Sequence, residues 1–370
     1  ESSLAAVASL SPTWLAGLPV MAFMTALALS QPAGSSLSGN FNLRRSMVVT
    51  ALCGALVLAA SGFATDILVL SALRCVNGVT YGLSLIFAQM AILRVVQPER
   101  RAWALAEFAT AIVAAGIVGP ALGAIAAERF GFQVAFLACA LAYVAAAATA
   151  ARLQLAAQAP AKQAASSLRA LKSFMCNGKA MAVTVLAAIP ARLLAAAVLL
   201  LITPLYLVEV GEATTVIGRV LPLYFVAFLV TAPWVARYSD QSGKRKPFVV
   251  AGCVLSGLAC GVLPWIGGAA GAALSCLLLG VGQAVLSAPQ MALITELCGG
   301  KGSASVEQGL ASFRFIERAG SIAAAPVAAV CVNFLGLSQS FAALGVAAAI
   351  AGFLLLLLAG ESKALQEVDA

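Results

Sequence analysis

The chain has 370 residues, of which 62% are hydrophobic and 10% charged, and its formal net charge is +8. A soluble domain carries roughly 25% charged residues, so these values exclude a soluble globular protein. They also exclude a nucleic-acid-binding protein, which needs a folded basic surface. The nine cysteines stand singly and histidine is absent, so we expect no metal centre, disulfide framework or cofactor.

Eleven apolar segments predict an all-α membrane protein. Each has at least 19 residues, which at 1.5 Å per residue is close to the roughly 30 Å of hydrocarbon that a membrane helix must cross. The predicted spans are residues 12–37, 46–64, 67–93, 102–127, 132–150, 180–208, 214–235, 247–265, 268–297, 305–334 and 338–359.

The basic residues outside these spans predict the orientation in the membrane. Sixteen Lys and Arg residues lie in connections of one side and in the C-terminal tail, whereas Arg129 is alone on the other side. Because basic short loops remain cytoplasmic, we expect a cytoplasmic C-terminus and an external N-terminus. The richness in alanine favours a bacterial inner membrane.

The sequence repeats itself with an offset of about 201 positions. This shift places Pro233 on Pro32 and the Gln-Met-Ala triplet 290–292 on 89–91. We therefore predict two homologous helical bundles. The predicted divisions are an N-terminal bundle at 1–151, a cytoplasmic linker at 152–179, a C-terminal bundle at 180–360 and a tail at 361–370.

The repeat also predicts a helix upstream of the first residue. Projecting the span 180–208 back by 201 positions places its counterpart from about position −21 to position 7. We expect a monomeric twelve-helix protein whose first helix precedes Glu1, where an extracytoplasmic domain could also be attached. A natural eleven-helix protein is the alternative.

A charged loop follows the span 214–235. Its sequence, 236–246, fits the pattern Gly-x-Leu-x-Asp-x-x-Gly-x-Arg-Arg after the first residues. The matching positions are Asp240, Gly243, Arg245 and Lys246. We expect Asp240 to face the positive N-terminal end of a neighbouring helix while the basic residues bind anionic headgroups, so that the loop acts as a conformational latch. A plain positive-inside turn is the simpler interpretation.

Two further motifs lie inside spans. The pattern Leu-x-x-x-Arg-x-x-Gln-Gly matches Leu70, Arg74 and Gly78, with Asn77 in place of Gln. The pattern Gly-x-x-x-Gly-Pro-x-x-Gly-Gly matches Gly119, Pro120 and Gly123, with alanine at the other two glycine positions. Small residues allow a partner helix to approach closely, and proline loosens the helix; an ordinary packing kink is the alternative.

With these three motifs the chain resembles the major facilitator superfamily over nearly its whole length. The resemblance implies two six-helix halves around a central cavity that opens alternately to either side. The equivalent first loop, 35–45, departs from the pattern because Gly39 stands at the acid position and Asn42 at the glycine. Only the second loop is therefore expected to act as a full latch.

Charged residues inside the spans are the main functional candidates, because each costs roughly 2.5–3.5 kcal/mol at mid-bilayer. Arg74 and Arg192 are expected to face a cavity or a buried polar network, Arg192 as an anion or carboxylate contact. Glu107 lies near a cytoplasmic end, where snorkelling is an alternative to proton carriage.

Further candidates are polar residues of the spans in the C-terminal half. Arg314, Glu317 and Arg318 lie near one helical face, either as an internal salt bridge or as a substrate and proton site. Gln283 and Asn77 can bind substrate or bond between helices.

These features favour a secondary transporter of a small organic solute. No ATP-binding motif occurs, and the Gly119 motif resembles that of family exporters coupled to inward proton flow, which favours proton-coupled efflux. The alternatives are an anion exchanger or uniporter using Arg74 and Arg192, and a transporter-like sensor or assembly module that does not transport. An enzyme is disfavoured, because no nucleophile, base and orienting group share a face.

Overall fold

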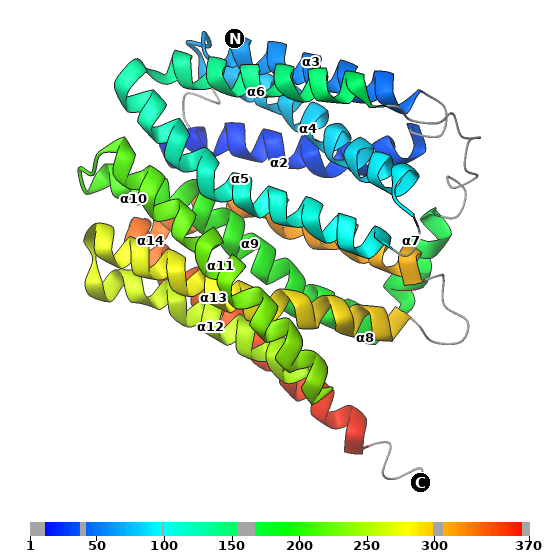
Figure 1. Ribbon diagram of the computed structural model, residues 1–370. Helices are drawn as coiled ribbons and strands as arrows, with labels where there is room; N and C mark the ends of the chain where they lie inside the picture. The colour runs from blue at the N-terminus through cyan, green and yellow to red at the C-terminus, as the bar shows by residue number, and fades with distance from the viewer. Residues whose placement is uncertain (1–11, 38–41, 98–99, 154–166, 299–305, 365–370) are drawn as a thin grey trace, which may run out of the picture. The chain divides into compact units, whose positions relative to one another are not determined.

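The computed structural model describes residues 12–37, 42–97, 100–153, 167–298 and 306–364, which form helices and short turns and contain no strand. The chain divides into two compact units, Glu1–Ala165 and Ser166–Ala370. The all-α prediction is confirmed (Figure 1).

The N-terminal unit contains five helices. They are α2 (Pro12–Leu37), α3 (Leu43–Ser61), α4 (Ile67–Val95), α5 (Arg101–Phe130) and α6 (Phe132–Arg152). Asn42 and Asp66 cap α3 and α4 by accepting hydrogen bonds from the first turn. Between α5 and α6, Gly131 has a φ of 86°, which glycine adopts without the steric cost of a side chain.

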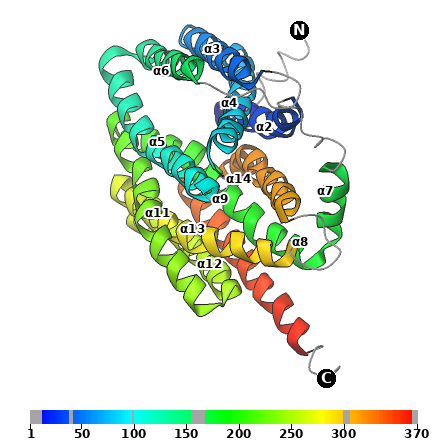
Figure 2. The same cartoon turned by 45° about the vertical axis from the view of Figure 1, so that its right-hand side comes forward.

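Small residues bring the helices of this unit together. A Cβ atom on Gly78 or Gly82, one turn apart on α4, would collide with the backbone or a side chain of α2. One on Gly54 of α3 would lie 2.5 Å from the ring of Tyr143 on α6. The pairs α2 with α4 and α3 with α6 therefore run side by side (Figure 2).

The first part of the C-terminal unit is a short helix, α7 (Ser167–Cys176), followed by one long interrupted span. Its segments are α8 (Gly178–Val183), η2 (Thr184–Ala188), α9 (Ile189–Ala197), η3 (Val198–Ile202) and α10 (Thr203–Glu209). Part of the linker predicted at 152–179 is thus helical, and its residues 154–166 lie outside the described part of the chain.

Two π-helical turns interrupt this span, each directly before a proline. The amide of Ile189 donates to the Thr184 carbonyl, and the amide of Thr203 to the Val198 carbonyl. Pro190 and Pro204 follow and have no amide hydrogen to donate, which disturbs the α-helical pattern in the preceding turn. The wider turns accommodate this loss.

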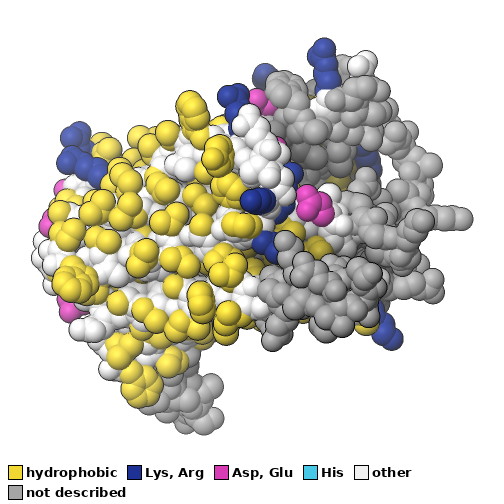
Figure 3. Space-filling model, turned by 90° about the horizontal axis from the view of Figure 1, so that it is seen from below, with side chains coloured by type: hydrophobic (Ala, Val, Ile, Leu, Met, Phe, Trp, Pro, Cys, Tyr) yellow, Lys and Arg dark blue, Asp and Glu magenta, His cyan; other side chains and the backbone are white. Residues whose placement is uncertain are grey.

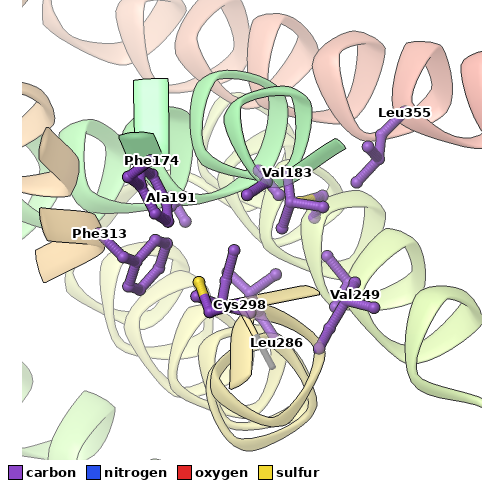
Figure 4. Close-up of a cluster of buried hydrophobic side chains, with 14 residues drawn as sticks. Phe174, Val183, Ala191, Val249, Leu286, Cys298, Phe313 and Leu355 are labelled. Atoms are coloured by element: carbon purple, nitrogen blue, oxygen red, sulfur yellow. The ribbon is translucent and has the colours of Figure 1, made fainter. Parts of the chain in front are cut away.

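Three long helices and one bent helix complete the unit. They are α11 (Thr214–Ser242), α12 (Arg245–Ile266), α13 (Gly268–Cys298) and α14 (Val306–Ala364). α14 contains two spans, because Gly336 with φ 76° and ψ 171° breaks the helix. Figure 4 shows the core that α12, α13 and α14 form with α7 to α9, where Phe174 and Phe313 lie 6.5 Å apart between ring centroids.

The helices have the length and surface of membrane spans. Nine helices of the described residues are long and apolar enough to cross a membrane, and the shorter apolar segment Gly17–Gln31 lies in α2. One of the nine is the bent α14, so the eleven predicted spans all correspond to helices. In the face that Figure 3 shows, hydrophobic side chains cover most of the described surface.

Candidate functional site

An ion pair between α9 and α14 is the charged centre of the C-terminal unit. Arg192 Nη2 donates to Glu317 Oε1 at 3.0 Å. Arg192 lies near the middle of the span Gly178–Glu209. Its side chain is 57% exposed, whereas that of Glu317 is 11% exposed. Because a charge facing lipid at this depth is costly, we expect the exposed guanidinium to face polar surroundings.

Gly320 allows the two helices to approach. It lies one turn after Glu317, and a Cβ atom there would overlap the Ile189 carbonyl and lie 3.1 Å from the Arg192 Cβ. The backbones of α9 and α14 are therefore in direct contact beside the ion pair. Glycine at this position is what lets Glu317 reach Arg192.

Residues of α11 and α13 surround the pair. Tyr224 lies close enough to Arg192 for an electrostatic interaction, and its ring stacks on Phe228 with centroids 6.4 Å apart. Gln283 is buried and donates to the Ala191 carbonyl at 3.3 Å and to Ser256 Oγ at 3.4 Å. The Gln283 amide thus connects α13 to the residue next to Arg192.

The charged centre of the N-terminal unit is different. Arg74 on α4 is half-buried, and its guanidinium carbon lies 5.0 Å from the centroid of the Phe136 ring on α6. Among the residues that the structure describes, no carboxylate forms an ion pair with it. Asn77, one turn later, is 4% exposed, and within the same described ranges its Nδ2 has no hydrogen-bond partner. Tyr143 lies close to both.

Of the other candidates inside the spans, Glu107 is not brought to either centre. Glu107 is exposed on α5. Arg314 is exposed and Arg318 half-buried on α14. The carboxylate of Glu317, which shares their helical face, binds Arg192 of another helix.

The charged loop forms a local network. Arg245, the first residue of α12, pairs with Asp240, donates to Ser239 Oγ at 3.2 Å and pairs with Glu296 of α13 at 3.3 Å. Gly243 ends α11 in the left-handed region, with φ 64°, which folds the chain so that Asp240 and Arg245 meet. Arg245 therefore contacts two carboxylates, where the sequence led us to expect lipid headgroups. Lys246 is exposed.

The glycines of the motif around Gly119, Pro120 and Gly123 make no close helix contact within the described structure. Pro120 lies inside α5, and nothing lies within 4 Å of a Cβ atom built on either glycine. A close-packing role for these residues stays a prediction.

Sequence reasoning missed Gly320, Tyr224, Phe136 and Glu296. Gly320 follows Glu317 by three residues, so one turn of helix separates them, and this spacing could have indicated a glycine beside the charge. The other three act across helices that are distant in sequence, and no local pattern points to them.

Two bundles of long apolar helices with charges inside the spans define a polytopic membrane transport protein. The chain belongs to the Major Facilitator Superfamily, whose family model matches residues 5–306 and, in a second match, 193–369. No curated protein sequence matches the chain.

Proposed function

We propose that this transporter is a proton-coupled secondary exporter of a small organic solute in a bacterial inner membrane, working by alternating access. The observation that carries the proposal is the ion pair of Arg192 and Glu317 inside the membrane spans. Such a pair has two states, because protonation of the carboxylate removes its charge and releases the guanidinium.

Glu317 is the residue that takes the proton in this scheme. Its carboxylate is shielded, with an exposed fraction of 11%. Arg192 of α9 forms the ion pair with it, and Tyr224 of α11 interacts with Arg192. On its own helix, Arg314 lies one turn before it and Arg318 directly follows it. The outward direction is supported by the resemblance of the Gly119 motif to that of proton-coupled exporters.

A second candidate is an anion exchanger or uniporter. It is supported by Arg74, which has no ion-pair partner among the residues described in the structure, and by the exposure of Arg192. Neither function requires ATP.

Transport in vesicles separates these functions. Everted membrane vesicles containing the protein are energised, and proton release is followed on addition of lipophilic cations, carboxylates and amino acids. Arg219, which is exposed near the start of α11, provides the control. A solute-dependent proton flux that Glu317→Gln abolishes and Arg219→Gln retains supports the proposal. Solute movement without proton flux contradicts it and favours exchange or uniport. No movement of any solute would favour a module that does not transport.

A further inference from the structure

The ion pair of Arg192 and Glu317 has unused binding capacity. A guanidinium has five N–H donors, and within the described residues Arg192 uses Nη2 for Glu317 Oε1 and forms no other ion pair or side-chain hydrogen bond. Its side chain is 57% exposed at mid-span. The remaining donors can receive a planar carboxylate in bidentate geometry.

Charge balance decides which solute fits. The pair itself is neutral, so a bound anion would give the pair a net negative charge, and a bound cation would give it a net positive one. An uncompensated charge at mid-span is less favourable than a neutral arrangement. A zwitterion adds no net charge and offers each member of the pair a new partner.

We propose that Arg192 and Glu317 form a binding site for small zwitterionic solutes of the amino-acid type. The solute carboxylate binds the Arg192 guanidinium, and its ammonium group binds the Glu317 carboxylate. One internal ion pair is thereby exchanged for two ion pairs with the solute, and no covalent bond changes.

Aromatic side chains beside the pair supply an apolar wall for the solute. Tyr224 interacts electrostatically with Arg192, and its ring stacks on Phe228 at an interplanar angle of 24°. Both residues are half-buried in α11. The solute with the best fit therefore carries an apolar or aromatic group.

The site defines a substrate class for the proposed exporter, and as a statement about the transported substrate it rests on the proposed function. A proton on Glu317 removes the anion that the solute ammonium needs. Proton and solute therefore compete for one carboxylate, and this exclusion is the condition for exchanging one against the other.

Binding to the full chain in lipid nanodiscs, without any gradient, tests the site independently of transport. The probes are L-phenylalanine, 3-phenylpropionate without the ammonium group, and phenethylamine without the carboxylate, followed by the other proteinogenic amino acids. We expect an amino acid to bind at least about tenfold more tightly than its two analogues. Arg192→Gln and Glu317→Gln should each weaken it by about tenfold or more, and Arg219→Gln should not.

Three results would overturn the site. They are that an analogue carrying a single charge binds as tightly as the amino acid, that no amino acid binds, or that Arg192→Gln leaves binding unchanged. Amino-acid binding without proton flux in vesicles would contradict proton-coupled export and leave the site standing. Proton-coupled export of a solute that does not bind at Arg192 and Glu317 would contradict the site and leave proton-coupled export standing.

Discussion

The two units accommodate an intramembrane arginine in different ways. In the N-terminal unit, Arg74 lies 5.0 Å from the ring of Phe136, and its charge is not neutralised by an ion pair with any described residue. In the C-terminal unit, Arg192 forms an ion pair at 3.0 Å with Glu317. A ring quadrupole stabilises a cation without titrating, whereas a carboxylate can lose its charge to a proton.

This difference separates a permanent charge from a switchable one. Protonation can change the partner of Arg192, but no described neighbour of Arg74 offers the same change. We therefore expect coupling in the C-terminal unit.

Removing the carboxylate should produce the largest effect. Glu317→Ala leaves Arg192 without its ion-pair partner, and we expect the free energy of unfolding to fall by about 2–3 kcal/mol. Breaking a fully buried pair costs roughly 3–5 kcal/mol, and we expect no more than this because the Arg192 side chain is half-exposed. Reversible unfolding in mixed micelles measures the free energy. The double variant Arg192→Ala with Glu317→Ala should lose less than the single variant, and an equal or greater loss would show that the pair is not coupled.

Separating α9 from α14 should have the next largest effect. Gly320→Ala places a methyl group against the Ile189 carbonyl, and overpacking of this kind costs about 1–3 kcal/mol. Gly119→Ala is the matched control, because nothing lies within 4 Å of its Cβ, and it should be neutral or slightly stabilising. Equal stability of both variants in the same unfolding assay would contradict the tight contact.

Removing the aromatic partner of Arg74 should cost less. Phe136→Leu retains apolar volume but removes the ring, and we expect the free energy of unfolding to fall by about 1 kcal/mol. A double-mutant cycle with Arg74→Gln isolates the interaction from the change in packing. A coupling energy near zero would show that the ring does not stabilise the cation.

The smallest effect is expected in the charged loop. Arg245→Gln removes contacts with Asp240 and Glu296, but both carboxylates are more than half exposed, so we expect a smaller loss of stability than for the preceding variants, and one that decreases with salt. Lys246→Gln serves as the control. A larger or salt-independent loss would show that the network does more than order the turn.

Local sequence patterns predicted most of the fold. Apolar runs long enough to cross a bilayer predict helices because the backbone must satisfy its own hydrogen bonds in lipid, and the structure has a helix at each predicted span. The same reasoning marked Arg192 and Glu317, because a charge in an apolar span is costly wherever it lies. It could not show that they pair, since 125 positions separate them.

By itself, the sequence determined the helical class, the spans and the positions of the costly charges, because hydropathy, helix length and charge act locally. Only the tertiary structure decided the partners. The sequence left open whether Arg314, Glu317 and Arg318 form an internal salt bridge or a substrate and proton site, and it did not name a partner on another helix. In the structure Glu317 binds Arg192, because contact of the α9 and α14 backbones at Gly320 brings that guanidinium within reach. Such a contact depends on how small residues of two segments that are distant in sequence pack against each other, and neither segment alone encodes it.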